Sequence, residues 1–178
     1  MKTNYDINME KIFPSVRKKP IPGDVFTFKN KFLGYGYGMV IKIGGPMCSE
    51  DLLVYIYNVF TKEIDLNVKL NKNDLAIDPK FINRRGWLDG FFKTTKHTKL
   101  KKDDMLEQHC FVYRSIFENE PEYVDENREA IKERIEPCGF YGLGNHRNID
   151  ALMSERYNLP FALPLESDGE MPKKIKWW

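Results

Sequence analysis

The sequence predicts a mostly β protein of the α+β class, in which a small antiparallel, curved sheet (SH3-like or barrel-like) carries one or two C-terminal helices packed on it. Three observations support this prediction: an opening Pro-Gly-Asp turn, a strand with glycine at every second position, and a strand that is apolar on both faces. Helical spacing of apolar residues is found only in the last third of the chain.

The first predicted strand opens with Pro20-Ile21-Pro22-Gly23-Asp24. The two prolines oppose a helix, and Gly23 followed by Asp24 is typical of a turn. The β-branched and aromatic residues after Asp24 favour a pleated, half-buried strand. We therefore expect the sheet to begin at residue 24.

The second predicted strand carries Gly34, Gly36 and Gly38 on one face, because side chains alternate between the two faces of a strand. Tyr35 and Tyr37 then share the other face. Three glycines on one face allow sharp bending or the close approach of another backbone. We expect residues 24–60 to form three consecutive strands of one antiparallel sheet.

The third predicted strand covers residues 52–60 and is apolar on both faces, which indicates that both of its faces are covered. Residues 61–78 are rich in Asn and Lys and are expected to form a loop with at most one helical turn. Two further strands are predicted at residues 89–96 and 109–114.

Two helices are predicted late in the chain. Asp125 can cap the first, which would run to about Ile135, and Asn148 can cap the second, which would end before Pro160. Between them, the closely spaced glycines of residues 139–144 are expected to form a turn or a tight strand.

The length of 178 residues indicates one domain with a core of its own. We expect a single β-rich domain at residues 20–178, preceded by an N-terminal extension at residues 1–19. The C-terminal pair Trp177-Trp178 is expected to dock in a groove of that domain, since two exposed indoles would favour aggregation.

Composition argues against several partners. The 28 Lys and Arg residues nearly balance the 26 Asp and Glu residues, so nothing in the overall charge favours nucleic acid or a membrane surface. No apolar run approaches the roughly 20 residues that a spanning helix needs, and we expect a cytoplasmic protein. Cys48, Cys110 and Cys138 are far apart and odd in number, which favours buried reduced thiols over a disulfide framework or a zinc site.

No catalytic constellation is found. His97, His109 and His146 are the only histidines, and their spacing matches no metal-ligand pattern. The sequence also lacks a nucleophile elbow and a phosphate-binding glycine loop. We therefore predict no catalytic residue, no metal and no cofactor.

The Pro-Gly-Asp strand and the glycine-tyrosine strand resemble the opening of the immunity protein 26 family of bacterial polymorphic toxin systems. Further blocks fit in order, and the resemblance covers roughly residues 18 to 157; these blocks are Leu52 to Phe60, Phe81 to Trp87, Gly90 to Thr94 and Cys138 to Gly144. The resemblance implies a non-enzymatic protein that binds a cognate toxin, whose identity the sequence does not give, and blocks its active site.

Two alternatives remain at this point. One is a nucleic-acid-binding SH3-like barrel, in which Tyr35, Tyr37 and Phe92 beside Lys93 would stack on bases. The other is a ribonuclease of the plasmid-maintenance kind, or a phosphoesterase-type hydrolase. That ribonuclease family usually has Arg-Pro after its glycine loop, whereas this chain has Gly38-Met39-Val40.

For an immunity protein, the candidate binding surface centres on two guanidinium groups beside an indole, because Arg and Trp are enriched at the energetic centres of protein interfaces. The predicted partner-binding residues are Arg84, Arg85, Trp87, Tyr35, Tyr37 and Phe92. The competing interpretation is that Trp87 packs on the barrel and the arginines are solvated or paired with nearby carboxylates.

Overall fold

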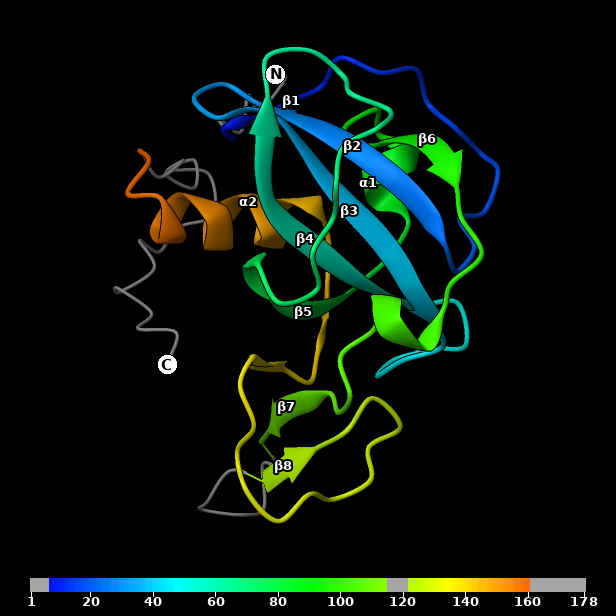
Figure 1. The fold of residues 1–178 in the computed structure, drawn as a ribbon, viewed down its shortest axis with the longest axis vertical. Coiled ribbons are helices and arrows are strands. Elements are labelled where there is room, and N and C mark those ends of the chain that lie inside the picture. The colour runs from blue at the N-terminus through cyan, green and yellow to red at the C-terminus, as the bar shows by residue number, and fades with distance from the viewer. Residues whose placement is uncertain (1–6, 115–121, 161–178) are drawn as a thin grey trace, which may run out of the picture.

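A curled half-barrel forms the larger part of the protein, and a smaller sheet lies beside it (Figure 1). The structure is a computed structural model that describes residues 7–114 and 122–160, so the pair Trp177-Trp178 lies outside the described residues. The half-barrel sheet contains β1 (Met9–Glu10), β2 (Asp24–Asn30), β3 (Gly34–Ile43), β4 (Leu52–Thr61), β5 (Leu75–Ile82), β6 (Lys93–His97) and β10 (Leu143–Gly144). The smaller sheet contains β7 (Cys110–Tyr113), β8 (Glu122–Val124) and β9 (Cys138–Phe140). The helices are α1 (Arg85–Leu88), the 3-10 turn η1 (Lys102–Asp104) and α2 (His146–Arg156).

The half-barrel sheet runs in the order β1-β2-β3-β4-β5-β10, and β6 pairs with β2. Strands β2, β3 and β4 are consecutive and antiparallel, which confirms the prediction for residues 24–60. The sheet is mixed rather than purely antiparallel, because β10 pairs in parallel with β5. In the smaller sheet β9 likewise pairs in parallel with β7. The strands of each parallel pair are far apart along the chain. A prediction that pairs neighbouring strands as hairpins does not anticipate them.

The glycines of β3 make room for phenylalanine rings of β2. A side chain at Gly36 would lie 2.3 Å from the ring of Phe28, and one at Gly38 would lie 2.4 Å from the ring of Phe26. At these two glycines the close neighbours are therefore aromatic rings and not the backbone that the glycine spacing led us to expect.

The two tyrosines of β3 share the other face, as predicted. Tyr35 is the register partner of Lys29, and Tyr37 is the partner of Thr27, two residues away on β2. Their environments differ, since Tyr35 is half-buried and Tyr37 is completely buried.

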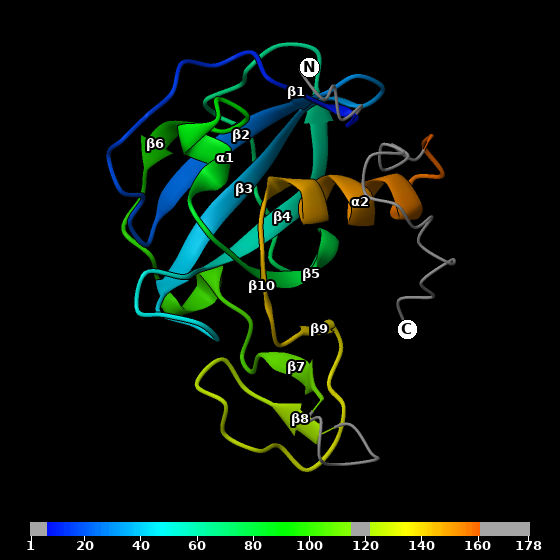
Figure 2. The ribbon, with the colours of Figure 1, turned by 180° about the vertical axis from the view of Figure 1, so that it is seen from behind.

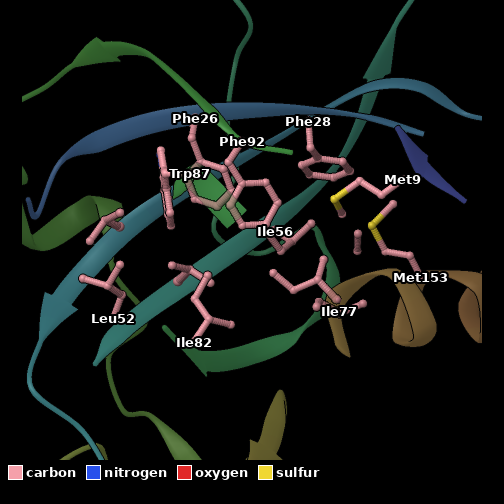
Figure 3. Close-up of a cluster of buried hydrophobic side chains, with 14 residues drawn as sticks. Met9, Phe26, Phe28, Leu52, Ile56, Ile77, Ile82, Trp87, Phe92 and Met153 are labelled. Atoms are coloured by element: carbon pink, nitrogen blue, oxygen red, sulfur yellow. The ribbon is translucent and has the colours of Figure 1, made fainter. Parts of the chain in front are cut away.

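The sheet has a hydrophobic core on each face, as the doubly apolar β4 predicted. Leu52, Val54 and Ile56 enter the core between the sheet, α1 and α2 (Figure 3). Leu53 and Tyr55 enter the second core, which also includes residues of the smaller sheet. In Figure 2, α2 lies across the open side of the half-barrel.

The segment predicted as an N-terminal extension contributes to this fold. Met9 is buried in the first core, and β1 pairs with the end of β2. Further along, the backbone N–H of Phe13 donates to the carbonyl of Gly90, and that of Val16 donates to the carbonyl of Trp87, each over 3.0 Å. Residues 9–16 are thus fastened to the half-barrel and to α1.

Two strand and loop predictions and one burial prediction need correction. The loop expected at residues 61–78 ends earlier, because β5 begins at Leu75. The strand expected at residues 89–96 is shorter, since α1 and a turn precede β6 at Lys93. Cys48 is exposed, which contradicts the prediction of burial, whereas Cys110 and Cys138 are buried.

The helix predicted from Asp125 to Ile135 is wrong. The Asp125 carboxylate accepts hydrogen bonds from the backbone N–H groups of Asn127 and Glu129, each over 2.8 Å. This local turn competes with a helix. Arg128 then adopts a left-handed conformation with φ 68°, which an α-helix does not allow.

The second predicted helix is confirmed as α2, but its cap is Asn145. The Asn145 side chain accepts from the backbone N–H of Arg147 over 2.8 Å, and the Asn148 side chain accepts from the backbone N–H of Asn145 over 2.9 Å. Asn148 is therefore the third helical residue of a reciprocal capping box. No helix within the described ranges is long and apolar enough to cross a membrane.

Candidate partner-binding surface

The short helix α1 places two arginines at the end of β5. The side chain of Asn83 accepts a hydrogen bond from the backbone N–H of Arg85 over 3.0 Å, which turns the chain into the helix. Gly86 permits close packing, because a side chain there would lie 2.2 Å from the ring of Phe92. The hydrogen bond to Asn83 and the close packing of Gly86 on Phe92 thus position α1 against the half-barrel.

Trp87 attaches α1 to the hydrophobic core. Its side chain is 1% exposed, and its ring centroid lies 4.8 Å from that of Phe26 and 5.0 Å from that of Phe92. The indole nitrogen donates to the hydroxyl oxygen of Thr94 over 3.1 Å. Trp87 and Phe92 therefore support α1 from inside the core, and neither is exposed at the surface.

Unlike Trp87, the two arginines are accessible to solvent. The Arg85 side chain is 61% exposed and forms an ion pair with Asp89, with 3.2 Å between Nε and Oδ2. Arg84 is half-buried near Glu50. The pKa of Glu50 lies below its usual range because Lys19 donates a hydrogen bond to it, and the charge of Arg84 adds a smaller effect.

The N-terminus of α2 lies beside the arginines, because the backbone N–H of Asn83 donates to the carbonyl of Gly144 over 3.0 Å. His146 is buried there and stacks on Phe91, with 4.2 Å between ring centroids. The pKa of His146 is lowered to about 4, mainly because the imidazole is buried. The charge of Asp89 opposes this shift, and the charges of Arg147 and Arg85 make smaller contributions to it. His146 is therefore neutral at pH 7.

The charges of Arg85 and Arg147 both act on His146, and Arg84 precedes Arg85 at the start of α1. We call these residues the arginine surface: Arg84, Arg85 and Arg147. Near it, Leu143 is 36% exposed on the edge strand β10. Positive charge beside accessible apolar area suits recognition of an acidic protein surface.

The remaining predicted residues lie elsewhere. Tyr37 is buried, and its hydroxyl is hydrogen-bonded to that of Thr61 over 2.6 Å, so it is not available to a partner. Tyr35 is accessible beside the Lys29 ammonium, 5.7 Å from its ring centroid. Tyr35 pairs with one end of β4, whereas Arg84 follows the β5 residues that pair with the other end. The structure therefore does not bring Tyr35 to the arginines.

Burial also removes the proposed base-stacking platform. Of its three aromatic members, Tyr37 and Phe92 are 0% exposed. A base needs an accessible ring face to stack on. Tyr35 and Lys93 alone do not form such a platform.

The three histidines lie in separate places. His97 pairs with Asp24 over 2.9 Å, and His109 lies between the Tyr55 hydroxyl at 2.5 Å and the Glu126 carboxylate at 3.0 Å. A cavity of about 560 Å³ next to His109 is lined by both acidic and basic side chains. Within the described residues, no group of three or more His, Cys, Asp or Glu side chains is arranged to hold a metal ion.

The prediction from sequence did not place Arg147 or Leu143 near Arg84 and Arg85. The sequence places Arg147 near a helix start, but the parallel pairing of β10 with β5 is what brings that start to α1. No local pattern signals this pairing, because its partners are about sixty residues apart along the chain.

Comparison with known protein families gives one match. The family model for immunity protein 26 matches residues 21–116, which are 96 of the 178 residues. The matched segment extends from the opening turn to just beyond β7 and contains Arg84 and Arg85. No curated protein and no solved structure matches the chain.

Proposed function

The chain belongs to the immunity protein 26 family and is an immunity protein that neutralises a cognate toxin, and we propose that it holds the toxin through the arginine surface. Proteins of this kind act by binding and not by turnover. The proposed contact is with a carboxylate-bearing surface of the toxin. Arg84 and Arg85 lie at its centre, while Arg147 and Leu143 lie beside them.

One observation supports this proposal above the others: two arginines are presented by a helix whose tryptophan is fully buried. A rigid support lowers the entropy that is lost when a partner binds. The hydrogen bond from Trp87 to Thr94 and the packing of Gly86 against Phe92 supply that support.

The chemistry of the guanidinium group fits the proposed partner. A guanidinium can donate two parallel hydrogen bonds to one carboxylate, and such charge-assisted pairs are strong and directional. The exposed ion pair between Arg85 and Asp89 does not block this, since exposed pairs contribute little stability and can exchange partners.

A protection assay tests the proposal. Cells that produce the cognate toxin are supplied with wild-type protein, with the charge-reversed pair R84E/R85E, or with the control pair K69E/K99E. Lys69 and Lys99 are exposed and lie outside the arginine surface. The proposal predicts survival with the wild type and the control, and loss of survival with R84E/R85E at equal soluble protein levels.

Two outcomes of this assay would contradict the proposal in different ways. Full protection by R84E/R85E would show that the toxin binds elsewhere while the immunity function stands. Equal loss with both pairs would show that general charge, and not the arginine surface, governs the encounter.

A further inference from the structure

Two cysteines lie side by side in the smaller sheet. Cys110 of β7 and Cys138 of β9 are register partners on neighbouring parallel strands, and their Sγ atoms are 2.7 Å apart. Strands pair at about 4.8 Å, which lies within the Cα separations of about 4.4–6.8 Å that a disulfide spans. The backbone positions therefore allow the two sulfur atoms to bond without moving either strand.

Both cysteines are buried in the folded protein. Cys110 is 0% exposed and Cys138 is 4% exposed. The backbone N–H of Ile135 donates to the sulfur of Cys110 over 3.4 Å, so the segment before β9 covers the thiols. Cys48, by contrast, is exposed.

We propose that Cys110 and Cys138 are a modification site at which a low-molecular-weight disulfide, such as oxidised glutathione, converts the two thiols into a protein disulfide. The first thiolate attacks one sulfur of the oxidant and releases one thiolate, which leaves a mixed disulfide on the protein. The second cysteine then attacks the protein-bound sulfur and displaces the other thiolate. The protein dithiol is oxidised, oxidised glutathione is reduced to two glutathione molecules, and both protons pass to the released thiolates.

Burial determines when this reaction takes place. The desolvation of Cys138 raises the pKa of its thiol to about 12, so the reactive thiolate is scarce in the folded protein. Oxidant access is blocked as well. The bond therefore forms while β9 is not yet docked on β7, and folding then shelters it from reductant.

The bond has a consequence for the neighbouring elements. It closes a loop from residue 110 to residue 138 that includes β8, and so it restrains the unfolded chain. β9 is followed at once by β10 and by the start of α2. The oxidised protein should therefore hold the connection to β10 more firmly, whether or not the arginine surface binds the toxin.

Refolding the full chain tests the proposal. The protein is unfolded with reductant, refolded in oxidised glutathione, unfolded again in alkylating reagent and digested for mass spectrometry. We expect Cys48 alone to carry the alkyl group or a bound glutathione, and a linked peptide pair that contains Cys110 and Cys138. The C48S variant should form the same link, and the C110S and C138S variants should not.

A second measurement does not depend on whether those variants fold. The oxidised form of C48S should have a higher midpoint of thermal unfolding than its reduced form, and its linked peptides should persist longer in reductant when the protein is folded than when it is unfolded. Alkylation of all three cysteines after refolding in oxidant, or a link that involves Cys48, would overturn the proposal.

Discussion

The indole of Trp87 donates a hydrogen bond to the hydroxyl of Thr94 over 3.1 Å, which ties the helix carrying the arginines to strand β6. The same indole packs against Phe26 of β2. Because β6 pairs with β2, one side chain fixes α1 against two adjacent strands. The position of Arg84 and Arg85 therefore depends on a residue that is buried in the core.

Trp87→Ala should lower the free energy of unfolding by about 3–5 kcal/mol, because it leaves a cavity in a packed aromatic cluster. Thr94→Val removes only the hydrogen-bond acceptor and should cost about 1 kcal/mol. Urea unfolding of both variants measures the difference. Equal losses would contradict the view that packing, and not the hydrogen bond, is the main contribution of Trp87.

Gly86→Ala should destabilise the protein by about 1–3 kcal/mol, since its new side chain would lie 2.2 Å from the Phe92 ring. Phe92→Leu removes part of that ring and should recover some of the loss when the two changes are combined. A double-mutant cycle from unfolding free energies measures this coupling. Strictly additive losses would show that Gly86 is not required by the Phe92 contact.

The sequence predicted most of the half-barrel because local patterns determine it. The glycine spacing of β3 and the doubly apolar β4 each match the two-residue period of a strand, and the phenylalanines of β2 fill the space that the glycines leave. The helix α2 was predicted from its apolar stripe, although its start was placed three residues late. Asn145 and Asn148 both take part in the cap, and sequence alone does not distinguish their roles.

The candidate surface was predicted only in part. Arg84 and Arg85 were selected because arginine is common at interfaces. The sequence alone does not show which of the other selected side chains are buried. Trp87, Phe92 and Tyr37 lie in the core, which agrees with the interpretation that Trp87 packs on the barrel. The helix expected from Asp125 failed because the carboxylate of that residue closes a turn on its own backbone.

Asp89→Asn should leave the free energy of unfolding within about 0.5 kcal/mol of the wild type, because its partner Arg85 is exposed and water screens the ion pair. It should tighten toxin binding by about 2-fold to 5-fold, since it removes a negative charge from a surface that recognises carboxylates. Arg85→Gln should do the opposite. Titration calorimetry with the toxin measures both effects, and weaker binding by Asp89→Asn would show that Asp89 is itself a contact.

Acid should weaken the fold partly through His146. Its pKa is about 4 in the folded protein because of burial, against about 6.5 in an unfolded chain, so below pH 6.5 the unfolded state binds the extra proton. The stability that neutral His146 supplies is complete above pH 6.5 and is lost as pH falls towards 4. The full loss is on the order of 3 kcal/mol.

Urea unfolding between pH 7 and pH 4.5 measures this effect in the wild type and in His146→Gln. Burial raises the pKa of Asp78 and Asp150, which favours the folded state in acid, but both carboxyls are present in both proteins. The difference between the two slopes therefore reports His146. Identical slopes would contradict the assignment of a buried, neutral imidazole.

Hydrogen–deuterium exchange of the free and the toxin-bound protein tests the central claim most directly, because it maps the contact without changing a residue. The proposal predicts slower exchange on binding at the backbone amides of residues 83–89 and 143–148, which carry the arginine surface. Slowing confined to residues 102–109 and 125–126, around the cavity beside His109, with no change at residues 83–89, would contradict it.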